Sequence, residues 1–146
     1  TEGYCSAVCA ALGIAISFSW RRGGLEQEAL RNDCATAPVM IPDEYVGHRP
    51  IGGDGPSGTR LKFPQQSADL SVRWCSSVAK ISCMDAWITN DPRFRDGGRR
   101  LVITGERAEE SPNRARYKVF EPHRSDLRQG IRYQRHVDHW RPVHAW

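Results

Sequence analysis

The sequence has no apolar run long enough to cross a bilayer. Its longest apolar run extends from Ala7 to Ile16, which is about half of the length that a membrane-spanning helix needs. No basic segment precedes this run, so the sequence indicates neither a membrane helix nor a secretory signal peptide. We therefore expect a cytoplasmic protein without a membrane partner.

The sequence also lacks the cysteine and histidine patterns that hold metals. Its five cysteines are irregularly spaced, and an odd number without a secretory signal indicates reduced thiols rather than a disulfide framework. No cysteines are adjacent and none form a Cys-x-x-Cys motif, so ligands for an iron–sulfur cluster are missing. Cys5 and Cys9 lie one helical turn apart in an apolar pattern, which is typical of small core residues. His136, His139 and His144 do not indicate a zinc site, because a strand would place the first two on opposite faces.

Lysine is scarce, with 3 lysines beside 18 arginines in a chain of net charge +4. The planar guanidinium group binds phosphate and sulfate through two parallel hydrogen bonds, whereas lysine acts as a point charge. This bias is typical of anion-binding proteins, although a GC-rich genome would produce the same excess of arginine. The basic residues are spread along the chain without a nucleic-acid-binding motif, so nucleic acid is a minor alternative, with tRNA its most reasonable form.

The 146 residues are predicted to form a single domain, 1–146, of alternating helices and strands. Apolar spacing and runs of β-forming residues define these elements. The predicted helices cover Gly3 to Leu12, Leu25 to Arg31, Ser67 to Ile88 and Pro112 to about Phe120, and the predicted strands cover Gly13 to Trp20, Arg99 to Thr104 and Arg135 to Trp140. Residues 35–66, rich in proline and glycine, are predicted to be a long loop. This order predicts an α/β fold of three layers, in which helices flank a mainly parallel sheet.

One segment, Leu101 to Arg114, runs from an apolar strand through a charged turn into a predicted helix. Ser111 fits the N-cap and Pro112 the first helical position. Arg107 and Arg114 would then lie at the positive end of the helix dipole, which disfavours cations. Two partners would compensate these cations: a phosphate or sulfate ligand, or carboxylates of the turn itself. The carboxylates in question are Glu106, Glu109 and Glu110.

Three segments occur in the order and at the spacing of a known family. Ser71 to Lys80, Gly105 to Arg114 and Trp140 to Trp146 together resemble the phosphoadenosine-phosphosulfate (PAPS) reductases, with weaker likeness at Phe18 to Gly24. This family is a branch of the PP-loop ATP pyrophosphatase superfamily. The resemblance implies the adenine nucleotide alpha hydrolase-like fold, an adenine nucleotide ligand such as PAPS or ATP with Mg, and thiol-dependent reduction of PAPS to sulfite. It also implies a thioredoxin-like reductant as a partner.

The sequence departs from this family in two motifs. The Ser-Gly-Gly-x-Asp-Ser phosphate loop is absent, and glycine-rich Ile51 to Gly58 does not replace it because no apolar strand precedes it and Pro56 interrupts it. The Glu-Cys-Gly-Leu-His segment with the nucleophilic cysteine is also absent. The chain therefore looks like a central portion of a family member, and an incomplete sheet would favour a homo-oligomer.

Three functions remain open on this evidence. The chain could be a PAPS-reductase-like enzyme module or a degenerate, non-catalytic module that binds nucleotides or other anions. The third is an ATP-dependent adenylylating or thiolation enzyme of the superfamily, acting on a substrate such as RNA.

The resemblance also implies a set of site residues. By analogy the anion ligands are Arg73, Lys80, Arg107 and Arg114, the carboxylates that orient them are Glu106 and Glu110, and the turn that carries them includes Gly105 and Ser111. Trp74 would pack against either the base or the core. Cys75, between two basic residues, is a weak candidate for a reactive thiolate. No metal ligand is expected.

Overall fold

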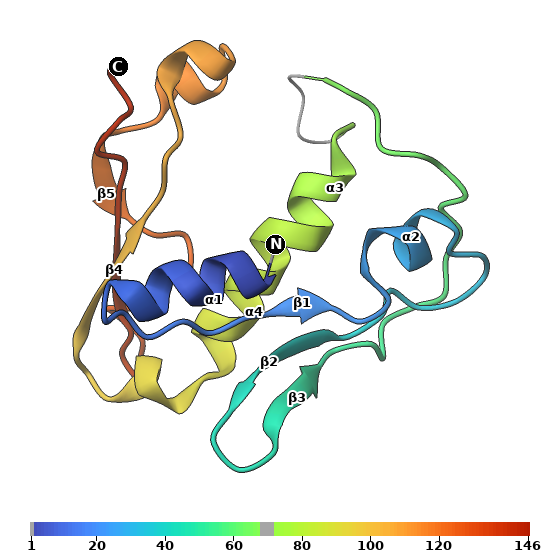
Figure 1. The fold of residues 1–146 in the computed structure, drawn as a ribbon, viewed down its shortest axis with the longest axis horizontal. Helices are drawn as coiled ribbons and strands as arrows, with labels where there is room; N and C mark the ends of the chain where they lie inside the picture. Colours follow the sequence, from blue (N-terminus) through green and yellow to red (C-terminus); the bar gives the residue numbers. More distant parts are fainter. Residues whose placement is uncertain (1, 68–71) are drawn as a thin grey trace.

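The computed structural model describes residues 2–67 and 72–146, which form a mixed α/β structure. Figure 1 shows two small sheets on opposite sides of the central helix formed by α3 and α4. The N-terminal sheet has the strand order β1-β2-β3, and the C-terminal sheet has the order β4-β6-β5. Of the strand pairs in the described residues, β4 with β6 is parallel and the other three are antiparallel. The observed sheets thus differ from the single, mainly parallel sheet that was expected.

The N-terminal helix α1, Glu2–Ala11, agrees with the prediction. It ends where Gly13 adopts φ 65° and the Ile14 N–H donates to the Cys9 carbonyl over 2.9 Å, the pattern of a glycine helix stop. The predicted strand 13–20 is wrong except at its last residue, because β1 is only Trp20–Arg21. Residues 14–19 have no ladder partner in the described chain, so their β-forming side chains do not make a strand.

The predicted long loop at 35–66 contains a β-hairpin. Helix α2, Gly24–Ala29, precedes it near its predicted place, and β2, Val39–Asp43, then pairs with β3, Gly47–Ile51. Two prolines obscured these strands in the sequence. Pro42 is tolerated in β2 because β1 pairs only with the first two residues of that strand, so its missing N–H interrupts no ladder on that side.

A cluster of buried apolar residues lies between β2 and the central helix. Val39 and Ile41 pack with Cys83, and alternation along β2 directs these two strand residues to the same face. The partly buried residues around this cluster are Ile51, Ala86 and Trp87. This packing fixes the position of the central helix relative to the N-terminal sheet.

The central helix comprises α3, Trp74–Ser76, a π-helical segment, Ser77–Ile81, and α4, Ser82–Asn90. It agrees with the predicted helix to within two residues at its C-terminal end, and residues 68–71 of that prediction lie outside the described residues. The helix begins at Trp74 rather than at Ser67. A π-helical turn inside an α-helix is frequently found at a functional site.

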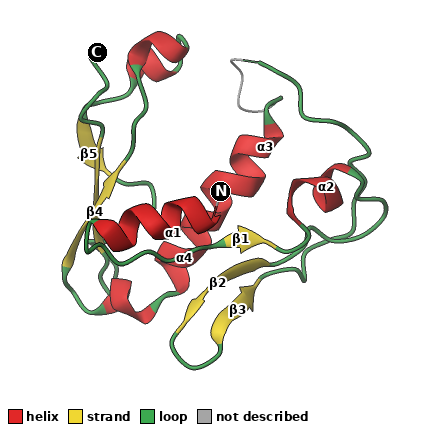
Figure 2. Ribbon diagram, viewed as in Figure 1, coloured by secondary structure: helices red, strands yellow, loops and turns green. Residues whose placement is uncertain are grey.

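The C-terminal sheet contains two predicted strands and one unexpected strand. β4, Arg99–Ile103, and β6, His136–Trp140, agree with the prediction, whereas β5, Phe120–Pro122, was not expected. The predicted helix from Pro112 to Phe120 is wrong, because the chain forms only short 3₁₀ turns, Ala108–Glu110 and Arg114–Arg116. Figure 2 shows that loops connect these turns to the strands. None of the helices in the described part of the chain is long and apolar enough to span a membrane.

Candidate functional site

A cavity of about 560 Å³ lies between the central helix and the C-terminal sheet. The helix contributes polar and apolar residues from its π-helical segment and from α4, and the sheet contributes residues from the ends of its three strands. The lining residues used below are Lys80, Ile81, Met84, Thr104, Glu106, Arg114, Tyr117, Glu121, Pro122, His123, Arg124, His139 and Arg141. Its volume falls in the usual range for small-molecule sites, about 300–1,000 Å³.

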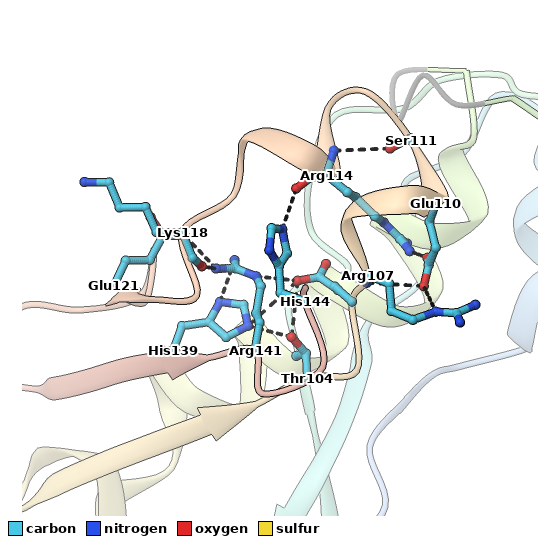
Figure 3. Close-up of polar contacts among 11 residues, drawn as sticks. Thr104, Arg107, Glu110, Ser111, Arg114, Lys118, Glu121, His139, Arg141 and His144 are labelled. Carbon is cyan, nitrogen blue, oxygen red and sulfur yellow. Dashed lines mark hydrogen bonds and ion pairs between the residues drawn. The ribbon is translucent and has the colours of Figure 1, made fainter. Parts of the chain in front are cut away.

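Four of these side chains form a closed ring of hydrogen bonds beside the cavity. The buried Arg141 donates from Nε to Glu106 Oε2 over 2.7 Å and from Nη2 to His139 Nδ1 over 2.9 Å. His139 Nε2 lies 2.8 Å from Thr104 Oγ1, which in turn lies 3.2 Å from Glu106 Oε2. Figure 3 shows Arg141, His139 and Thr104 converging at one point. The ring holds the end of β4 against the end of β6.

Arginine has only donors, so it fixes every proton in this ring. Because Arg141 donates to His139 Nδ1, the neutral imidazole carries its proton on Nε2 and donates to Thr104 Oγ1. The Thr104 hydroxyl then donates to Glu106. His139 has no free lone pair toward Thr104 and does not act as its general base, so the ring is a structural element and not a nucleophilic dyad.

Arg141 also binds the neighbouring strand and loop. Its Nη1 atom donates to Glu121 Oε1 and to the Lys118 carbonyl, both over 2.7 Å. Together with Glu106, these contacts compensate a guanidinium group that is buried. They also fix β5 beside β6, where the two strands pair antiparallel.

A second buried imidazole, His123, lines the same cavity. The Ser125 N–H donates to His123 Nδ1 over 3.1 Å, so the neutral ring carries its proton on Nε2. The ring lies edge-on to His139, with 5.3 Å between centroids. His123 is 4% exposed.

The buried position and nearby cations keep both imidazoles neutral. Burial lowers the pKa of His139, and the charge of Arg141 lowers it further. Burial and the adjacent His139 likewise lower the pKa of His123. Burial alone would raise the pKa of Glu106, but the hydrogen bond and charge of Arg141 outweigh this effect and hold the pKa below its ordinary value.

Three of the predicted site residues line this cavity: Lys80, Glu106 and Arg114. Lys80 lies in the π-helical segment, and its side chain is exposed and forms no ion pair within the described residues. Arg114 instead pairs with Glu110. Glu106 belongs to the ring, where it binds Arg141 rather than a predicted arginine.

The remaining predicted residues are not among those that line the cavity. Arg107 pairs with Glu109 over 2.8 Å and lies 3.8 Å from Glu110, so carboxylates of the turn compensate it, which was one of the two alternatives. Ser111 Oγ accepts from the Arg114 N–H over 3.2 Å, which is the expected capping contact without the expected helix. Gly105 lies in the exposed loop after β4.

The start of the central helix is partly a packing site. Trp74 is buried, and the Arg60 guanidinium lies 4.4 Å from its ring centroid, so the core alternative applies to this tryptophan. The Arg73 Nε and Trp74 Nε1 atoms are buried without a hydrogen-bond partner among the described residues. Cys75 is half-buried and is not among the residues that line the cavity.

Sequence reasoning missed the buried half of this site. His139 and Arg141 lie in or beside the Trp140 to Trp146 segment, so the end of that strand was a usable signal. His123 and Glu121 lie in a stretch that was predicted to be helix and loop, and nothing in the sequence marked them. His144 donates from Nε2 to the Arg114 carbonyl over 2.9 Å, which holds the C-terminal loop on the turn.

Fold and site together define a mixed α/β protein with a cationic cavity between a helix and a sheet edge. Four of the lining side chains named above are cationic and two are anionic. Within the described residues, no group of three His, Cys, Asp or Glu side chains is placed to hold a metal ion. Comparisons with family models, curated proteins and solved structures found no match for this chain.

Proposed function

We propose that this chain binds an adenine nucleotide or sulfonucleotide, as the resemblance to PAPS reductases implies, in the cavity between the central helix and the C-terminal sheet. The observation that carries the proposal is the position of Lys80. Lys80 lines a cavity with excess positive charge, and its ammonium group has no carboxylate partner in the described chain. The parallel pair β4–β6 with the helix beside it would then be one side of the three-layer nucleotide-binding fold.

The composition of the cavity supports a nucleotide rather than a bare ion. Lys80 and Arg124 provide positive charge for phosphate or sulfate groups. Ile81, Met84 and Tyr117 provide apolar and aromatic surface of the kind that contacts a base. A ligand with an anionic end and a flat apolar end matches both the cationic and the apolar lining residues of the cavity.

A binding role without catalysis is favoured for the described chain. The family's chemistry needs a cysteine thiolate at the sulfonyl group, and the residues that line this cavity do not include a cysteine. The family activity, with a thioredoxin-like reductant, would require a thiol from elsewhere. The adenylylating alternative would use the same cavity for ATP with Mg.

Calorimetric titration with PAPS, 3′-phosphoadenosine-5′-phosphate and Mg-ATP tests this proposal. We expect Lys80→Ala to weaken binding by about tenfold or more, the size of a charge-assisted contact. Lys118→Ala is the matched control, because Figure 3 shows the Lys118 side chain pointing away from the polar ring.

A second variant separates the cavity from the turn at Gly105 to Arg114, where the resemblance placed two arginine ligands. Arg107→Ala should leave binding unchanged if the nucleotide lies in the cavity, since Arg107 is paired with carboxylates of its own turn. A large loss of affinity in Arg107→Ala with none in Lys80→Ala would move the site to the Gly105 to Arg114 turn. No heat from any of the three ligands would contradict nucleotide binding.

A further inference from the structure

His123 presents a hydrogen-bond donor to the cavity that the described residues do not use. Its Nδ1 atom accepts from the Ser125 N–H, which leaves the Nε2–H as the free polar group of a side chain that lines the cavity. In the described residues Nε2 has no hydrogen-bond partner. Nε2 is not among the fully buried polar atoms that lack a partner, so this N–H is accessible and is available to an acceptor that comes from outside the chain.

The surroundings of His123 indicate the chemistry of that acceptor. Lys80 lines the same cavity and forms no ion pair with any of the residues that the structure describes. Arg124, next in sequence, is held in place by two bonds to Asp85, the longer of them 3.1 Å from Nε to Oδ1. Asp85 already pairs with Arg124, so the Lys80 ammonium group and the His123 N–H are the groups left for a ligand, and a neutral carbonyl would satisfy only one of them. A tetrahedral anion offers several acceptor oxygens together with negative charge.

We infer that His123 is a binding residue for a tetrahedral oxyanion, and that its Nε2–H donates to a phosphate or sulfate oxygen of the ligand. This inference rests on the proposed function and adds to it. It places the anionic end of the nucleotide beside His123, where strand β5 ends, and not on the turn from Gly105 to Arg114. The contact is made by a neutral imidazole, so it contributes direction and selectivity more than charge.

Two variants test the role of the N–H. His123→Phe keeps an aromatic ring beside His139 and removes the donor, whereas the side-chain amide of His123→Gln retains an N–H. Adenosine 5′-phosphate and adenosine 3′-phosphate are titrated separately. We expect His123→Phe to weaken the binding of at least one of these two nucleotides by about tenfold. His123→Gln should lose less affinity for that nucleotide. Adenosine itself should bind both variants as tightly as it binds the unmodified chain. The phosphate ester that responds identifies which end of the nucleotide reaches His123.

Nitrogen NMR of the unmodified chain gives a test that does not depend on the folding of a variant. At pH 7.5, titration with inorganic phosphate and then with inorganic sulfate should shift the His123 Nε2 resonance in a saturable manner. If 3′-phosphoadenosine-5′-phosphate binds by calorimetry while neither it nor the two inorganic anions shifts the His123 Nε2 resonance, the inference is wrong and the proposed function stands. If the nucleotides do not bind at all, the proposed function fails first.

Discussion

Arg141 is the residue on which the most contacts of the candidate site depend. Its guanidinium group binds Glu106, Glu121 and the Nδ1 atom of His139. Removing one partner of a buried charge pair leaves the other charge uncompensated, which costs about 3–5 kcal/mol. A lysine would not replace it, because a single ammonium group cannot hold three partners in the plane of the guanidinium fork.

We therefore predict that Arg141→Ala lowers the free energy of unfolding by about 3–5 kcal/mol, measured by urea denaturation. Arg116→Ala, at an exposed arginine in the nearby 3₁₀ turn, is the control and should change it by less than about 0.5 kcal/mol. An equally small decrease in the free energy of unfolding in both variants would show that the ring of hydrogen bonds does not contribute to stability.

The two buried imidazoles predict a dependence of stability on pH. Burial lowers the pKa values of His139 and His123 below the ordinary value of 6.5, so below about pH 6.5 the unfolded chain binds more protons than the folded chain. Stability is then complete above this pH, falls as the pH drops from 6.5 toward the folded pKa values, and levels off below them. Protonated His139 would also direct an N–H at Arg141.

Thermal unfolding followed from pH 7.5 to pH 5 checks this dependence. Glu106, whose pKa is held below 4.5, remains ionised across that range. The double variant His123→Gln/His139→Gln should show a flatter profile than the unmodified chain. Identical slopes would mean that the imidazoles take up protons equally in the folded and unfolded states.

At the scale of elements, the β2–β3 hairpin depends on its turn. Asp43 Oδ1 accepts from the Tyr45 N–H over 3.0 Å and from the Val46 N–H over 3.2 Å, and Gly47 closes the turn at φ 74°. This combination of an aspartate side chain and a left-handed glycine is a recognised turn signal.

We predict that Gly47→Ala destabilises the protein by about 1 kcal/mol, because a Cβ is disfavoured in the left-handed region. Space is not the reason, since nothing lies within 4 Å of the added atom. Gly55→Ala is the matched control, as that position also has open space and lacks a positive φ. Chemical denaturation of both variants measures the difference, and an equal effect would remove the conformational explanation.

At the scale of the whole molecule, one face of the C-terminal sheet is apolar and exposed. Ile103 pairs with Trp140 and Trp140 with Phe120 across the sheet, and all three are exposed, Ile103 to 57%. Helix α1 buries none of its residues. It carries exposed Tyr4 and Val8 four residues apart, which is one stripe of a helix, and exposed Leu12 follows just after its last residue.

We propose that a second copy of the chain covers these two surfaces. In a twofold interface, the α1 stripe of each copy would pack on the apolar face of the other copy's C-terminal sheet. Light scattering should then detect a dimer that Ile103→Lys dissociates. Ile131→Lys, at a fully exposed isoleucine outside the sheets, should leave the dimer intact. A monomer at high concentration would contradict this expectation.

The sequence by itself determined the elements that local pattern specifies. Helical spacing located α1, α2 and the central helix, and apolar runs located β4 and β6. The family-like segments also identified Lys80, Glu106 and Arg114, three of the residues that line the cavity. In each case the sequence pattern that makes the prediction is local to one element. The periodic spacing of apolar side chains and the residues of turns depend only on neighbours in the sequence.

Only the tertiary structure decided the features that depend on distant partners. β2 became a strand because β3 pairs with it and the central helix packs on it, despite two prolines in the hairpin. Residues 14–19, in contrast, have no ladder partner among the described residues. Pro112 and Ser111 predicted a helix, but the loop after them instead forms β5 on β6. The ring of Arg141, His139, Thr104 and Glu106 joins residues up to 37 positions apart. Such contacts arise only when burial brings unrelated segments together and leaves each polar group to find its partner.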